Sequence, residues 1–174
     1  MATETSPVFL VHAAADPVVL VINGRASYLN CAPVAQFFDK LLKQGRRKFI
    51  LDFSRCTGMD STFLGIIAGA AIEARRHQPP GSLALMGLSP RNLELVKNLG
   101  LHRLVTVDGD ASPALSAEQA KVLTTPDHEE LANARLILKA HENLCVVDPN
   151  NRGKFEDVLA FLKAQVDKDA SGGK

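Results

Sequence analysis

Two runs decide the fold of this chain: Lys48-Phe49-Ile50-Leu51-Asp52-Phe53-Ser54 and, five residues further on, Asp60-Ser61-Thr62-Phe63-Leu64-Gly65. The first run is apolar, aromatic and β-branched, with one acid near its end, and predicts a buried strand. The second run opens with Asp, Ser and Thr ahead of apolar residues. That order is typical of a helix N-cap, because the side-chain oxygens accept from free backbone N–H groups. The sequence therefore predicts a strand, a loop over residues 55–59 and a helix with hydroxyl groups at its start.

The segments before these runs predict two strands and a helix. Residues 8–11 and 18–23 are short apolar runs, which indicate a hairpin or two neighbouring strands. Residues 31–43 place apolar side chains on one helical face, and Gly45 follows in the position of a C′ residue.

The helix that begins near Thr62 is expected to end near His77, because two prolines and a glycine follow it. It is rich in small residues, including Gly65 and Gly69. Outside a membrane, this spacing favours close packing of the helix on a sheet.

Further strands and helices alternate along the chain. Residues 82–86 and 104–107 read as strands, and Ser89-Pro90 begins a helix that Gly100 ends. The predicted fold class is therefore α/β, a mixed sheet of about four to five strands flanked by helices.

A turn-rich segment at residues 108–113 predicts a domain boundary. We place one domain at residues 1–112 and a helical extension at residues 113–174, with a frayed tail from residue 170.

The extension predicts two helices, one over residues 127–141 and one that carries apolar residues from Phe155 to Val166. Residues 148–151 break the chain between them. Residues 144–147 could instead form a strand, although a helical hairpin is favoured. The apolar face of the second helix requires burial against the domain or against a second copy of the chain, which would make a homodimer.

Composition excludes several classes of protein. The chain has 174 residues, 46% of them hydrophobic, and a net charge of +1, which gives no support for a nucleic-acid partner. No export signal or membrane-length apolar run is visible, so we expect a cytoplasmic protein without a membrane partner. Three cysteines at unrelated spacings favour reduced thiols over disulfides or a zinc site.

Signatures of catalysis are absent from the sequence. It contains no Walker A sequence, no GxGxxG after a strand and no GxSxG. Asp52 and Asp60 have no histidine or cysteine close by in sequence to complete a nucleophile–base pair. His102 and His141 are lone histidines beside charged residues and are expected at the surface. We therefore predict no enzymatic activity, no cofactor and no metal.

Four motifs together resemble the STAS domain, found in bacterial anti-sigma factor antagonists, in stressosome subunits and at the ends of sulfate transporters. They lie at residues 49–54, 58–65, 85–90 and 99–101, in the family's order and spacing. The resemblance covers roughly residues 7 to 110. It implies a small mixed sheet flanked by helices and no catalytic activity.

The resemblance also implies a switch. In the antagonists, a serine after the aspartate of this motif is phosphorylated by a partner serine kinase that is itself the anti-sigma factor, and a phosphatase reverses the reaction. By motif, the phosphoacceptor here is Ser61, preceded by Asp60, with Thr62 as second choice. A phosphate at a helix N-terminus gains roughly 0.3–1 kcal/mol when exposed, so the modification should not unfold the domain.

Two positions depart from the family pattern. Phe63 stands where the family usually has Gly, and Ser27 lies in a segment that usually carries an acid. We name the predicted partner-binding and switch residues together the switch surface: Ser27, Asp52, Asp60, Ser61, Thr62 and Phe63.

The favoured hypothesis is a non-enzymatic regulatory protein-binding module, resembling an anti-sigma factor antagonist, that phosphorylation of Ser61 switches to control transcription or stress signalling. The alternative is a scaffold STAS module, stressosome-like or an oligomeric adaptor, whose contacts do not depend on phosphate. A small-ligand sensor is a third hypothesis, supported by the fold alone.

Overall fold

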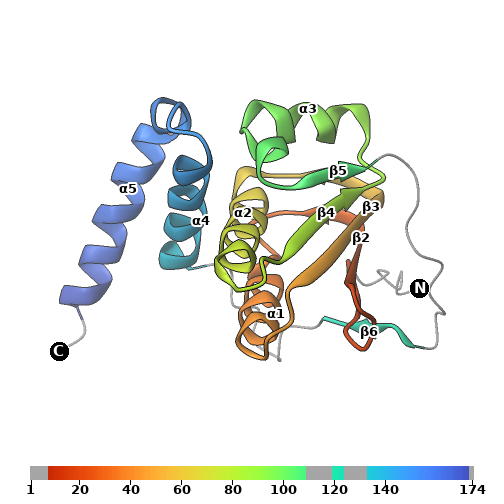
Figure 1. Cartoon of the computed structure of the whole chain (residues 1–174). Coiled ribbons are helices and arrows are strands. Elements are labelled where there is room, and N and C mark those ends of the chain that lie inside the picture. The colour runs from red at the N-terminus through yellow and green to blue at the C-terminus, as the bar shows by residue number, and fades with distance from the viewer. Residues whose placement is uncertain (1–7, 109–118, 124–132, 173–174) are drawn as a thin grey trace, which may run out of the picture.

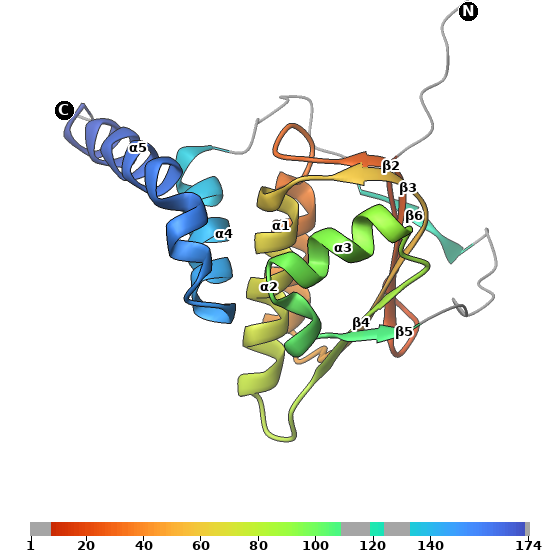
Figure 2. The ribbon, with the colours of Figure 1, turned by 90° about the horizontal axis from the view of Figure 1, so that it is seen from above.

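The structure is a computed structural model and describes residues 8–108, 119–123 and 133–172. Its centre is a six-stranded mixed sheet with the order β5-β4-β3-β2-β1-β6. Helices α1 and α2 lie between this sheet and the C-terminal helices α4 and α5 (Figures 1 and 2). The strands are β1 Phe9–His12, β2 Val18–Ala26, β3 Lys48–Met59, β4 Ser82–Met86, β5 Thr106–Asp108 and β6 Lys121–Val122.

The predicted hairpin is confirmed, because β1 pairs antiparallel with β2, for example Phe9 with Ile22. Strands β2, β3, β4 and β5 run parallel to one another. The predicted strand at residues 82–86 is also confirmed, with the same bounds.

The loop predicted over residues 55–59 is wrong, since β3 continues to Met59. Pairing with β2 persists through two register shifts and ends at Ala26 opposite Met59. The polar residues Ser54 and Arg55 are exposed on this part of the strand. Strand β2 provides hydrogen-bond partners for the backbone of β3 here, so the polar side chains do not end the strand.

The helices of this part of the chain are α1 Ala32–Lys43, α2 Ser61–Arg76 and α3 Pro90–Asn98, followed by a short 3-10 helix at Leu101–Arg103. Gly45 and Gly100 both adopt positive φ after a helix, as predicted for C′ residues. The Gly45 N–H donates to the Leu42 carbonyl and satisfies the last turn of α1.

The sheet has six strands rather than four to five. The strand that sequence does not predict is β6, two residues long, which pairs antiparallel with β1 at Leu10 opposite Val122. A two-residue strand has no periodicity to detect. Strand β6 lies after the domain boundary expected at residue 112. The division into a domain of residues 1–112 and an extension of residues 113–174 stays a prediction. Strand β5 begins only at Thr106, because the 3-10 helix precedes it.

A helical hairpin ends the described chain, as favoured from the sequence, with α4 at Ala134–Val147 and α5 at Asn151–Ser171. The alternative strand at residues 144–147 is wrong: this segment continues α4, and Leu144 is fully buried. Residues 127–132 of the predicted first helix and the last two of the predicted frayed tail lie outside the described residues. No helix in the described ranges is long and apolar enough to cross a bilayer.

Candidate functional site

Asp60 joins the start of α2 to the loop that follows β2. Its Oδ1 accepts from the Phe63 N–H at 2.9 Å, which caps the helix. Its Oδ2 accepts from the Tyr28 N–H at 2.8 Å. One carboxylate therefore fixes two segments that lie 32 residues apart in the chain.

The loop after β2 is held by its own polar side chains. The Ser27 N–H donates to Asn30 Oδ1 at 3.0 Å, and Asn30 Nδ2 donates to the Arg25 carbonyl at 2.8 Å. Ser27 is buried, whereas Tyr28 and Leu29 are 47% and 57% exposed. Ser27 is one of the two departures from the family pattern. Its segment lies beside Asp60 and presents two apolar side chains to solvent.

Ser61 is the first residue of α2, and its hydroxyl contacts a residue that lies 80 positions away. Ser61 Oγ lies 3.0 Å from Nε2 of His141 on α4. His141 Nδ1 lies 2.8 Å from the Ile137 carbonyl. A carbonyl can only accept, so Nδ1 carries a ring proton, and in the neutral ring Nε2 accepts from the Ser61 hydroxyl.

His141 was predicted at the surface, and that prediction is wrong. The residue is 3% exposed, and its ring meets the Phe155 ring edge-on at a centroid distance of 4.9 Å. It is buried because the face of α4 that carries His141 packs on α2. The contact is of the kind a nucleophile makes with a base, with a backbone carbonyl as the third member.

Four members of the predicted switch surface are buried: Ser27, Asp52, Thr62 and Phe63. The ring of Phe63 stacks on Phe9 at a centroid distance of 5.9 Å and belongs to the core. Asp60 and Ser61 are half-buried, so these two members reach solvent.

Asp52 is not at the end of its strand, as the sequence suggested, because β3 runs for seven residues beyond it. Its Oδ1 accepts from the Ser54 N–H at 2.9 Å, a bond within the same strand. This local bond is the contact that the structure gives to the Asp52 carboxylate.

A cavity of about 500 Å³ lies beside Ser61, between the end of β3, the start of α3 and α5. Its lining includes Arg25, Arg91, Leu95 and Phe155 together with Asp60 and Ser61. The lining thus holds two arginines and two carboxylates, Asp60 and Glu94, next to the candidate phosphoacceptor. No motif marks Arg25, Arg91 or Phe155, because they come from three distant segments.

Cys31 lies directly before α1 and is fully buried. Burial, and second the charge of Asp60, raise the pKa of its thiol from 9.0 to about 12. The thiol therefore stays protonated at neutral pH. All three cysteines are free.

Residues 9–106 match the family model described as Mlab, STAS domain. The chain belongs to the STAS domain family. Two similar solved structures are forms of the anti-sigma factor antagonist SpoIIAA. The unphosphorylated form is 23% identical, covers 55% of this chain and 80% of that one, and gives a TM-score of 0.45. The phosphorylated form, from Bacillus, is 22% identical, with 52% and 81% covered and a TM-score of 0.44. The curated proteins contain no match to the chain.

The family match ends before α4, and this helix packs closely on α2 of the STAS domain. A Cβ atom at Gly65 would overlap the Ala140 carbonyl and lie 2.7 Å from the Ala140 Cβ. A Cβ atom at Gly69 would overlap the side-chain amide of Asn143. The two glycines thus serve contact with a helix, and the prediction that they pack on the sheet is wrong.

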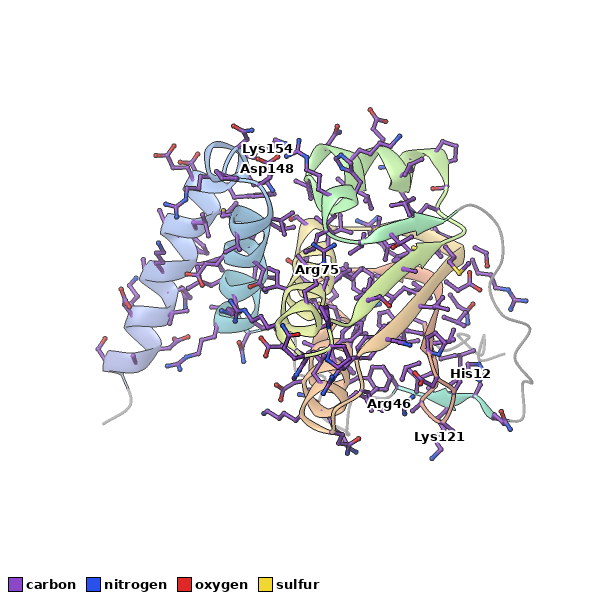
Figure 3. All side chains as sticks on the ribbon, in the orientation of Figure 1. His12, Arg46, Arg75, Lys121, Asp148 and Lys154 are labelled. Carbon is purple, nitrogen blue, oxygen red and sulfur yellow. The ribbon has the colours of Figure 1, made fainter. Side chains whose placement is uncertain are left out.

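The turn between α4 and α5 docks on the end of α3. Asn151 is fully buried, and its Nδ2 donates to the carbonyls of Leu99 and Leu144 at 2.9 and 2.8 Å. Lys154 donates to the Asn98 carbonyl, and Figure 3 shows Asp148 and Lys154 at this junction. The STAS domain therefore holds the hairpin at two places, along α2 and at the end of α3.

Proposed function

We propose that this STAS protein is a non-enzymatic regulatory binding module, of the kind of an anti-sigma factor antagonist, and that phosphorylation of Ser61 switches it. The observation that carries the proposal is the position of Ser61. It is the first residue of α2, follows the capping Asp60 and lines the cavity beside it. Thr62 is buried, which favours Ser61 as the acceptor over its neighbour.

The electrostatics of the position suit a phosphate. A phosphoserine carries about −1.5 to −2 charges and three acceptor oxygens. At Ser61 these would lie at the positive end of the α2 dipole, and Arg25 and Arg91 of the cavity lining could pair with them, against the opposing charge of Asp60 and Glu94. The partners of such a switch are a serine kinase that is also the anti-sigma factor and a phosphatase. They would act with the protein in the cytoplasm, in control of transcription or stress signalling.

The test uses the full chain, ATP and an extract of cells that naturally express the protein, with phosphate mapped by mass spectrometry. We expect incorporation at Ser61, loss of it in Ser61→Ala, and no change in Ser54→Ala. Ser54 is an exposed serine on β3 whose backbone N–H, not its hydroxyl, bonds to Asp52. Phosphate elsewhere, with Ser61→Ala unaffected, would overturn the assignment.

A second candidate is a scaffold module, stressosome-like or an oligomeric adaptor, whose contacts do not depend on phosphate. The observation that favours it is the bond from the Ser61 hydroxyl to His141, which leaves this hydroxyl already engaged. Equal binding of the natural partner by Ser61→Asp and Ser61→Ala would support this candidate. A homodimer through α5 belongs with it, since Val158 and Phe161 are exposed on that helix. The mass of the protein in solution tests the dimer.

A further inference from the structure

The hairpin covers the face of α2 that carries Ser61. Along this face, Ser61 meets His141, Gly65 meets Ala140 and Gly69 meets Asn143. Phe155 of α5 lines the cavity on the next side of Ser61. A protein that modifies or binds Ser61 from the cavity therefore contacts the hairpin as well as α2.

The hydroxyl proton of Ser61 is also engaged. A kinase that transfers a phosphoryl group to a serine needs a base of its own within reach of that proton. Here the proton lies on the line to His141 Nε2 at 3.0 Å. A kinase base that takes this proton competes with His141 for it, and displacement of His141 moves α4.

The hairpin has the features of an element that opens locally. Its fully buried apolar side chains are few, and four more of its apolar side chains are partly buried against the core, whereas α2 buries most of its length. These four are Leu136, Ile137, Val147 and Phe155. The residues of the hairpin that are buried are Ala140, His141, Leu144, Asp148, Asn151 and Leu162. Asn143 Nδ2 holds α2 through the Gly65 carbonyl at 3.3 Å. Water can replace such polar contacts, and an element that buries less apolar surface than the sheet opens at a lower free energy than the sheet.

We propose that the α4–α5 hairpin is a removable cover on the Ser61 face of α2, and that a partner protein which acts at Ser61 competes with α4 for this face. The proposal rests on the proposed function of Ser61 and adds its regulation. When the hairpin is removed, one side of α2 is a groove of small residues four apart, Ser61, Gly65 and Gly69. It accepts a helix at short distance, and α4 shows the chemistry that fits: a small residue opposite Gly65 and an amide that reaches its carbonyl.

Modification and opening favour each other in this arrangement. A phosphorylated Ser61 has no proton on Oγ, and Nε2 of His141 has none in the tautomer that Ile137 fixes. While His141 is neutral, two acceptors would then face each other where a hydrogen bond now lies, and the cover is weakened. By linkage, release of the cover promotes modification of Ser61 to the same extent.

Hydrogen exchange of the full-length protein tests whether the cover opens by itself. Asn151→Ala removes two hydrogen bonds of the hairpin turn and leaves the Ser61 face unaltered. We expect exchange of the α4 amides to accelerate roughly tenfold or more, with the amides of β3 unchanged. Asn150→Ala is the matched control, because Asn150 is exposed and its side chain makes no capping bond. If α4 and β3 exchange together in every variant, the hairpin is one unit with the sheet and the proposal is overturned.

The coupling to Ser61 is tested in the same experiment, without any kinase. Ser61→Asp places negative charge beside His141, whereas Ser61→Ala only removes the hydroxyl. We expect faster exchange of the α4 amides in Ser61→Asp than in Ser61→Ala. Equal or slower exchange would show that α4 tolerates or binds the charge, which overturns the coupling. Failure of the proposed function is seen separately, as phosphate that maps away from Ser61.

Discussion

The two sides of α2 differ in what they contact and in how firmly they are held. On one side Phe63 stacks on Phe9 and meets Phe53 edge-on, so large rings from β1 and β3 join the helix to the sheet. On the other side Gly65 and Gly69 let α4 approach, polar bonds join the helices, and α4 buries the apolar Ala140 and Leu144. The sheet side cannot open without loss of the core. The α4 side can exchange its contacts for those of a partner.

The largest effect is expected on the sheet side. Phe63→Ala should lower the free energy of unfolding by about 3–5 kcal/mol, because it empties a fully buried aromatic site. Denaturant unfolding measures it. Phe161→Ala is the control: this ring is 68% exposed and its loss should change stability by less than about 0.5 kcal/mol. Similar losses in the two variants would contradict the assignment of Phe63 to the core.

On the α4 side, Gly65→Ala should undock the hairpin. The added methyl overlaps the backbone of Ala140, and relief of such overpacking costs about 1–3 kcal/mol. Hydrogen exchange should show loss of protection in α4 and α5, with the sheet protected. Gly153→Ala makes the same change on α5, where no atom lies within 4 Å of the added Cβ. A Gly65→Ala protein with a protected α4 would refute the close contact.

Asp60 joins the start of α2 to the loop after β2, and its removal should have an intermediate effect. Asp60→Ala leaves the Phe63 and Tyr28 N–H groups without their acceptor, at a cost of about 0.5–2 kcal/mol. Thermal unfolding measures the loss. Asp157→Ala, at an exposed position of α5, should leave the melting temperature nearly unchanged. Equal melting temperatures for the two variants would argue against the cap.

The smallest effect is the contribution of Cys31 to the pH dependence of the free energy of unfolding, which is absent at neutral pH. Burial raises the pKa of its thiol from 9.0 to about 12, so the folded state holds the proton more tightly than the unfolded state. The stabilisation is complete below pH 9 and is lost as the pH rises toward 12. Unfolding in denaturant at pH 8 and at pH 10.5 should show this loss, and Cys31→Ala should lose less over the same interval. Identical pH dependence would contradict the burial of the thiol.

Local chemistry in the sequence was enough to predict most elements. Asp60 and Ser89 cap α2 and α3 as expected, and β4 has the predicted bounds. These features depend on neighbours within a few residues. The continuation of β3 past Arg55 was missed because it depends on pairing with β2, and the short β6 because it depends on β1.

The candidate site was predicted in part for the same reason. Ser61 and Asp60 follow from a local motif, and the structure places both at the start of α2. His141 was predicted at the surface because its charged neighbours in sequence say nothing about α2. The glycine spacing indicated close packing, but the partner, α4, is decided by a tertiary contact.

The most direct test compares hydrogen exchange of the full-length protein with and without phosphate on Ser61. Phosphoserine is placed at position 61 during synthesis, so no kinase is required. If Ser61 is a switch beneath a removable cover, the α4 amides exchange faster in the phosphorylated protein while those of β3 keep their protection. Unchanged or slower exchange of α4 would contradict this mechanism.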